Sequence, residues 1–85
     1  MAKSLAYQEA KKLIEEARRE GETELDLSGM ALTEVPEEIA QLSNLQMLYL
    51  QNNQLTRIPE VIAQLSQLKG LSLYHNQIKE IPEEF

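Results

Sequence analysis

Apolar residues follow two different spacings along the chain, and the spacing changes near Gly21. In residues 3–20 they recur every three or four positions, as they do on one face of an α-helix. The members of this stripe are Ala6, Ala10, Leu13, Ile14 and Ala17. Ser4 stands where an N-cap belongs, and Gly21 stands where a helix commonly ends. The pattern predicts an amphipathic helix over residues 3–20 whose apolar stripe packs on its own domain.

Beyond Gly21 the chain repeats itself. Residues 32–54 and 55–77 match at 14 of 23 positions without a gap. Residues 78–85 begin a third copy, and residues 22–31 resemble the end of a copy that precedes the first. A fixed period of this length is typical of a solenoid, in which each copy forms one coil and stacks on its neighbours.

Each copy contains a short alternation of apolar and polar residues, which predicts a half-buried strand. The inward positions of the three expected strands are Leu25, Leu27, Leu48, Leu50, Leu71 and Leu73. Asn53 and Asn76 follow their strands at a bend, where a buried amide can hydrogen-bond the backbone of two coils. Met30 occupies this position in the first coil, so we expect the ladder of Asn side chains to start in the second.

A Val-Pro or Ile-Pro step then turns the chain back, since proline restricts φ. The segment after each proline predicts a short helix or 3₁₀ stretch on the convex side. Its expected buried residues are Ile39, Leu42, Ile62 and Leu65. The Glu pairs at 37–38 and 83–84 are interpreted as solvated ends of these helices, where negative charge is favourable.

The repeated pattern L-x-x-L-x-L-x-x-N-x-L resembles that of the leucine-rich repeat family over residues 22–85. In the first full copy it is carried by Leu45, Leu48, Leu50, Asn53 and Leu55. The added proline step is similar to the repeat class of bacterial proteins and of Roco-type proteins. The resemblance implies an α/β fold: a right-handed solenoid with an N-terminal helical cap, a short parallel concave sheet and short convex helices. Residues 1–21 would be the capping helix and residues 22–85 about two and a half repeats, together one domain.

The charge and composition exclude several classes of function. The formal net charge is −6, which disfavours binding to nucleic acid or to an anionic membrane surface. There is no Cys, so the chain has no disulfides and no thiolate metal site. The N-terminus lacks the apolar run of a signal peptide, and no apolar stretch is long enough to span a membrane. We therefore expect a cytoplasmic protein.

Residues suited to catalysis are scarce. A Ser-His-Asp arrangement would need Ser72, His75 and Asp26. His75 is the one His of the chain and Asp26 is the one Asp. Asp26 and Ser72 would stand two strands apart, about 10 Å, with Tyr49 between them. One His and one distant Asp do not form a metal site, and no phosphate-binding glycine motif occurs. The sequence predicts no cofactor and no enzymatic activity.

The differences between the two long copies point to a binding face. Five of the nine differing pairs lie on or beside the strand. Tyr and Met are enriched in protein interfaces, although strands also favour Tyr for packing reasons. The predicted partner-binding residues are Asp26, Met47, Tyr49, Gln51, Ser72, Tyr74 and His75. The family resemblance implies the same surface, because such repeats typically bind proteins through the concave sheet.

A second hypothesis concerns the C-terminal end, where the third copy stops before its strand. The last strand would have an unpaired edge, which invites pairing with another chain. The residues predicted for self-association, most simply as a homodimer, are Leu71, Leu73, Ile81 and Phe85. The alternative to a binding module is therefore a structural fragment or engineered unit of a longer array that self-associates through this edge.

Overall fold

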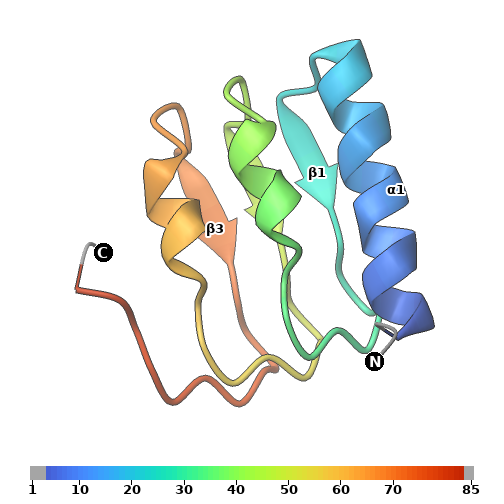
Figure 1. Ribbon diagram of the computed structural model, residues 1–85. Coiled ribbons are helices and arrows are strands. Elements are labelled where there is room, and N and C mark those ends of the chain that lie inside the picture. Colours follow the sequence, from blue (N-terminus) through green and yellow to red (C-terminus); the bar gives the residue numbers. More distant parts are fainter. Residues whose placement is uncertain (1–3, 84–85) are drawn as a thin grey trace.

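The computed structural model describes residues 4–83 and shows one helix followed by three similar turns (Figure 1). Each turn contributes one strand, and a 3₁₀ helix leads from each strand to the next. The elements in chain order are α1 (Leu5–Glu20), β1 (Glu24–Asp26), η1 (Glu37–Gln41), β2 (Met47–Tyr49), η2 (Glu60–Gln64) and β3 (Gly70–Ser72). The expected helix, strands and short convex helices are all present.

The first helix begins after the predicted cap Ser4, two residues later than the predicted range, and ends before Gly21 as predicted. The Ser4 side chain accepts a hydrogen bond from the Tyr7 backbone N–H at 3.1 Å, which caps the first turn. Gly21 adopts the left-handed conformation, with φ of 63°, and its N–H bonds back to the helix. The buried face of α1 consists of Ala10, Ile14 and Ala17, three members of the predicted stripe. This face packs against β1 and η1.

The three strands form one parallel sheet in the order β1-β2-β3. Leu25 pairs with Leu48, and Leu48 pairs with Leu71, so the register is the sequence repeat itself. Backbone hydrogen bonds continue beyond the short strands, for example from Leu27 N–H to Tyr49 O at 2.9 Å and from Leu50 N–H to Ser72 O at 2.8 Å. The coils are therefore joined over more residues than the strands alone.

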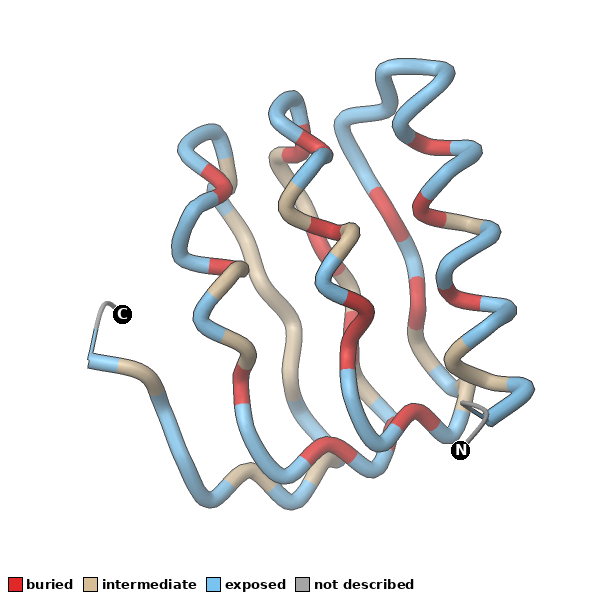
Figure 2. Tube along the Cα trace, in the orientation of Figure 1, coloured by how far each residue is buried: buried red, intermediate tan, exposed pale blue. Residues whose placement is uncertain are grey.

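The core lies between the sheet and the 3₁₀ helices. Pro36 and Pro59 lead into η1 and η2, and Ile39 and Ile62 are the buried residues of those helices. Figure 2 shows that buried stretches of the strands and of the 3₁₀ helices lie opposite one another, and the leucines of β1 and β2 are buried on the strand side. Together with Leu42 and Leu65 they form one continuous apolar cluster. All four residues expected to be buried on the convex side are buried.

Two asparagine side chains join successive coils, as the sequence predicts. Asn53 accepts hydrogen bonds from the N–H groups of Met30 and Leu32 and donates to Leu27 O and Leu50 O, all at 3.0 Å. Asn76 repeats this one coil later, accepting from Leu55 N–H and donating to Leu50 O. The amides, that of Asn53 buried and that of Asn76 half-buried, satisfy backbone groups that the strand ladder does not reach.

Glu37 and Glu38 lie in the first turn of η1, as interpreted from the sequence, but Glu38 is not simply solvated. Glu38 is half-buried rather than solvated, and its carboxylate forms an ion pair with Lys11 of α1 at 3.3 Å. The position of α1 beside η1 is the reason, because it brings a cation over the start of the 3₁₀ helix. Glu37 is exposed as expected, and Glu84 lies outside the described residues.

Candidate functional site

The outward side chains of the three strands form rows across the concave face of the sheet. Asp26, Tyr49 and Ser72 are in register and make up one row. Glu24, Met47 and Gly70 make up the row beside it. No helix of the described chain lies over this face, since α1, η1 and η2 all lie on other sides (Figure 1). The structure thus brings most of the predicted partner-binding residues onto one surface.

The Asp26 carboxylate is held by its own strand end. Asp26 Oδ1 accepts hydrogen bonds from the Ser28 hydroxyl at 2.6 Å and from the Ser28 N–H at 2.9 Å. These two donors hold the pKa of the Asp26 carboxyl below its usual value, and the hydroxyl has the larger effect. The side chain is therefore a fixed negative charge at the β1 edge of the face.

Met47 and Gly70 pack as a large and a small residue. A Cβ atom at position 70 would lie 2.6 Å from the Met47 Sδ and Cε atoms, so the methionine side chain lies over the glycine. This contact gives a structural reason for one of the five sequence differences near the strands. Met47 is half-buried and presents only part of its surface to a partner.

His75 lies at a bend rather than on a strand. Its φ is 56°, in the left-handed region, and Asn52 has a φ of 60° at the equivalent position of the preceding coil. Gly29, with a φ of 64°, occupies the same position in the first coil. Asn and His adopt this conformation more readily than most residues. The 52/75 difference therefore also has a backbone explanation, which the sequence pattern alone does not reveal.

The remaining predicted residues differ in accessibility. Tyr74 is 59% exposed and its ring contacts that of His75 edge-on, with 5.1 Å between the ring centroids. Tyr49 and Ser72 are half-buried in the centre of the face. Gln51 is also half-buried, and its side-chain Oε1 is buried without a hydrogen-bond partner in the described part of the chain. The aromatic surface is thus concentrated on β2 and just after β3.

Sequence reasoning missed one outward residue. Glu24 is exposed on β1, two positions before Asp26, and therefore points to the same side. The alternation of the strand was sufficient to find it. With Asp26 it makes the β1 side of the face acidic, whereas β2 and β3 carry no charged outward residue.

The arrangement considered for catalysis is not assembled. Asp26 and Ser72 lie on the two outer strands with Tyr49 between them, and the Asp26 carboxylate already accepts hydrogen bonds from Ser28. Within residues 4–83, no group of three His, Asp or Glu side chains is placed to hold a metal ion. None of the helices formed by these residues is long and apolar enough to cross a membrane.

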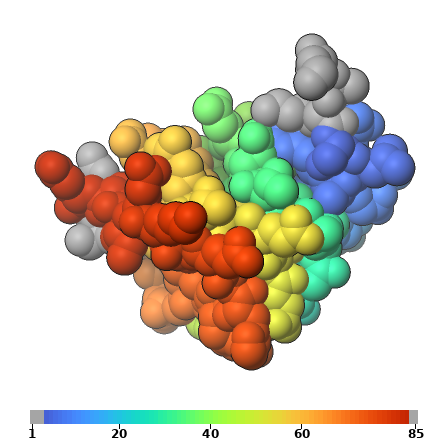
Figure 3. Space-filling view, turned by 90° about the horizontal axis from the view of Figure 1, so that it is seen from below, coloured from blue at the N-terminus to red at the C-terminus, as the bar shows by residue number. Residues whose placement is uncertain are grey.

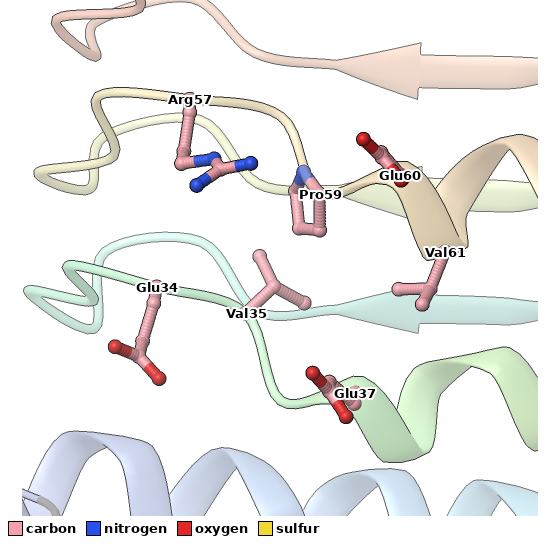
Figure 4. Close-up of a pocket in the computed structure, with 7 residues that line it drawn as sticks. All are labelled: Glu34, Val35, Glu37, Arg57, Pro59, Glu60 and Val61. Atoms are coloured by element: carbon pink, nitrogen blue, oxygen red, sulfur yellow. The ribbon is translucent and has the colours of Figure 1, made fainter. Parts of the chain in front are cut away.

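A pocket of about 390 Å³ lies on the opposite side of the molecule, where two loops enter η1 and η2 (Figure 4). Its lining is Glu34, Val35, Glu37, Arg57, Pro59, Glu60 and Val61. Most of these residues occupy equivalent positions of two adjacent coils, so the pocket is the space between stacked coils. It contains one cation among three carboxylates and shares no residue with the concave face.

At the C-terminal end the structure leaves apolar surface accessible. The far edge of β3 pairs with no other strand of the described chain. Leu71 and Leu73 are half-buried, and Ile81 is 66% exposed. Seen from below, this end lies across the molecule from α1 (Figure 3). Phe85, the fourth residue predicted for self-association, lies outside the described residues.

Comparison with known proteins gives two findings. A family model described as leucine rich repeat matches residues 23–85. A segment of 43 residues is 46% identical to the leucine-rich repeat protein soc-2 homolog of Nematostella vectensis. That segment is 51% of this chain and 8% of the relative, so the chain spans only a small part of that protein's length.

Proposed function

Because the chain belongs to the leucine-rich repeat family, whose members generally mediate protein–protein interaction, we propose that it binds a protein partner through its concave strand face. The observation that carries this proposal is the row of outward side chains on β1, β2 and β3, which no other described element covers. The convex side, in contrast, is where η1 and η2 close the core.

The chemistry of the face supports contact with another protein. Tyr49 and Tyr74 provide aromatic area with few rotatable bonds, and such residues commonly dominate the energy of an interface. The backbone beneath them is already hydrogen-bonded within the sheet, so the surface is pre-formed. A pre-formed surface loses less conformational entropy on binding.

The test compares the proteins captured from the source cell by three immobilised versions of the chain. We expect partners of the unaltered chain to be depleted by the double substitution Tyr49→Ala and Tyr74→Ala, each change costing about 1–3 kcal/mol of binding free energy. Tyr7→Ala, in α1, is the matched control because it removes the third tyrosine away from the strands. Equal capture by all three versions would place the interface on another surface.

A second candidate function is self-association through the C-terminal edge, and it is favoured by the burial of the strand leucines. Leu48 is fully buried on β2, whereas its counterpart Leu71 on β3 is half-buried. The unpaired edge of β3 beside it offers backbone groups to a second copy. A two-fold dimer would place the same patch of both copies in contact and pair the two strands antiparallel.

Sedimentation at micromolar concentration tests this candidate. We expect a dimer that Leu71→Glu converts to a monomer, since a buried carboxylate at the contact is costly. Glu60→Gln, on the convex side, should leave the dimer intact. A monomer at every concentration would refute the self-association, and a dimer unaffected by Leu71→Glu would move it to another surface.

A further inference from the structure

A groove of about 240 Å³ lies between α1 and β1 at the margin of the concave face. Its lining residues are Leu13, Glu16, Ala17, Glu20, Glu22, Glu24, Leu25 and Asp26. Three of these are apolar and half-buried or buried, and the other five are exposed carboxylates. The groove therefore has apolar side chains at its base and negative charge around its opening.

The charges around this groove are not neutralised within the described chain. Among the described residues, ion pairs of α1 join Arg18 to Glu15 and Lys11 to Glu38, and neither involves a groove residue. Glu20 also lies in the last turn of α1, where the helix dipole disfavours a negative charge. A cation bound in the groove would lie among these carboxylates and offset this unfavourable interaction.

The sheet is correspondingly asymmetric. Outward charge on the strands is confined to Glu24 and Asp26 of β1, while Tyr49 lies at the centre of the face and the exposed Tyr74 follows β3 at the other end. Neighbouring strands lie about 4.8 Å apart, so the acidic margin and the last strand are separated by about 10 Å. About three residues of extended polypeptide span that distance.

We propose that the concave face receives a basic polypeptide segment, with a Lys or Arg side chain in the α1–β1 groove and an apolar or aromatic residue on Tyr49 and Tyr74. This inference rests on the proposed function and specifies the partner's chemistry. The aliphatic stem of Lys or Arg would lie against Leu13 and Leu25, and its charged group would lie among the carboxylates. The two anchors of the partner should be about three residues apart.

The test uses random twelve-residue peptides displayed on phage and selected against the intact chain, followed by titration of the recovered peptides as free synthetic peptides. We expect the recovered peptides to be enriched in Lys and Arg. We expect Glu20→Gln with Glu24→Gln to weaken them at least about fivefold at low salt, because charge pairs at the margin of an interface act mainly through long-range attraction. The difference should shrink near 0.5 M salt, where screening is strong.

The matched control is Glu37→Gln with Glu60→Gln, which changes the net charge equally but on the convex side. One outcome would overturn this inference and leave the proposed function standing. The recovered peptides would bind less tightly to the Tyr49→Ala variant, but they would not be enriched in Lys and Arg and would not respond to Glu20→Gln with Glu24→Gln. Peptides indifferent to both sets of substitutions, or a selection that recovers no peptide, would count against both.

Discussion

The two ends of the stack of coils begin from the same repeated sequence but differ in how well they are covered. At the N-terminal end, α1 lies over the first coil, and both Leu25 of β1 and Leu27 just after it are buried. At the C-terminal end, the equivalent Leu71 and Leu73 are half-buried, as the change in colour along the third coil shows (Figure 2). The same residue type at the same repeat position therefore has a different environment in each coil.

The difference shows that burial in a stacked structure depends on neighbours on both sides. Each coil shields only one face of the next, so a terminal coil needs a separate element to complete its core. The amphipathic helix does this for β1, with Ile14 almost fully buried against it. Within the described residues nothing equivalent lies beyond β3.

The largest expected effect comes from truncating a leucine in the middle coil. Leu50→Ala should lower the free energy of unfolding by about 2–5 kcal/mol, because this side chain is fully enclosed. Leu73→Ala, at the same position of the last coil, should cost about 1–2 kcal/mol because less area is buried. Urea denaturation of both variants measures the contrast. Equal losses would show that the two ends are equally well packed in solution.

Ile14→Ala tests the contribution of the covered end. We expect a loss of about 2–4 kcal/mol, since the substitution leaves a cavity between α1 and the first coil. Leu5→Ala is the control on the same helix, because Leu5 is 84% exposed and should contribute little. Thermal melting followed by circular dichroism compares them. A small loss for Ile14→Ala would mean that the first coil does not need the helix.

The asparagine ladder offers the same comparison with polar groups. Asn53→Ala leaves two N–H groups and three carbonyls without the amide and should cost about 1–3 kcal/mol. Asn76→Ala should cost about 1 kcal/mol or less, because the groups around it are more accessible to water. Amide hydrogen exchange should show faster exchange at Met30 and Leu32 in the first variant. Unchanged protection there would contradict the observed hydrogen bonds.

The smallest effect concerns the acidic edge of the concave face. Ser28→Ala removes the hydroxyl donor to Asp26, so the pKa of that carboxyl should rise toward its ordinary value. The depressed pKa contributes stability above the pKa of the unfolded chain, and this is lost as pH falls through the folded value. The variant should therefore lose less stability on acidification. A carboxyl titration by nuclear magnetic resonance measures the shift, and an unchanged pKa would show that the hydroxyl does not hold the charge.

Much of the candidate surface was predictable from the alternation of the strands, and some of it was not. The row of Asp26, Tyr49 and Ser72 follows directly from the repeat. The packing of Met47 over Gly70 and the left-handed bend at His75 do not follow from the repeat. A residue can differ between two copies because of its packing or backbone angle, or because it contacts a partner, and the sequence does not separate these causes. At these two positions the difference between the copies has a structural cause, whereas Tyr49 and Tyr74 remain candidates for contact with a partner.

The period of the repeat, the register of the sheet and the caps of the helix follow from the amino-acid pattern. A fixed spacing of leucines decides which side chains face inward, and Ser4 and Gly21 act within a few residues of their own position. The packing of distant segments fixes which leucines are enclosed, pairs Glu38 with Lys11, and forms the acidic groove between α1 and β1. The physical reason is that burial and electrostatics depend on segments distant in the chain, whereas helix caps and strand alternation are properties of neighbouring residues.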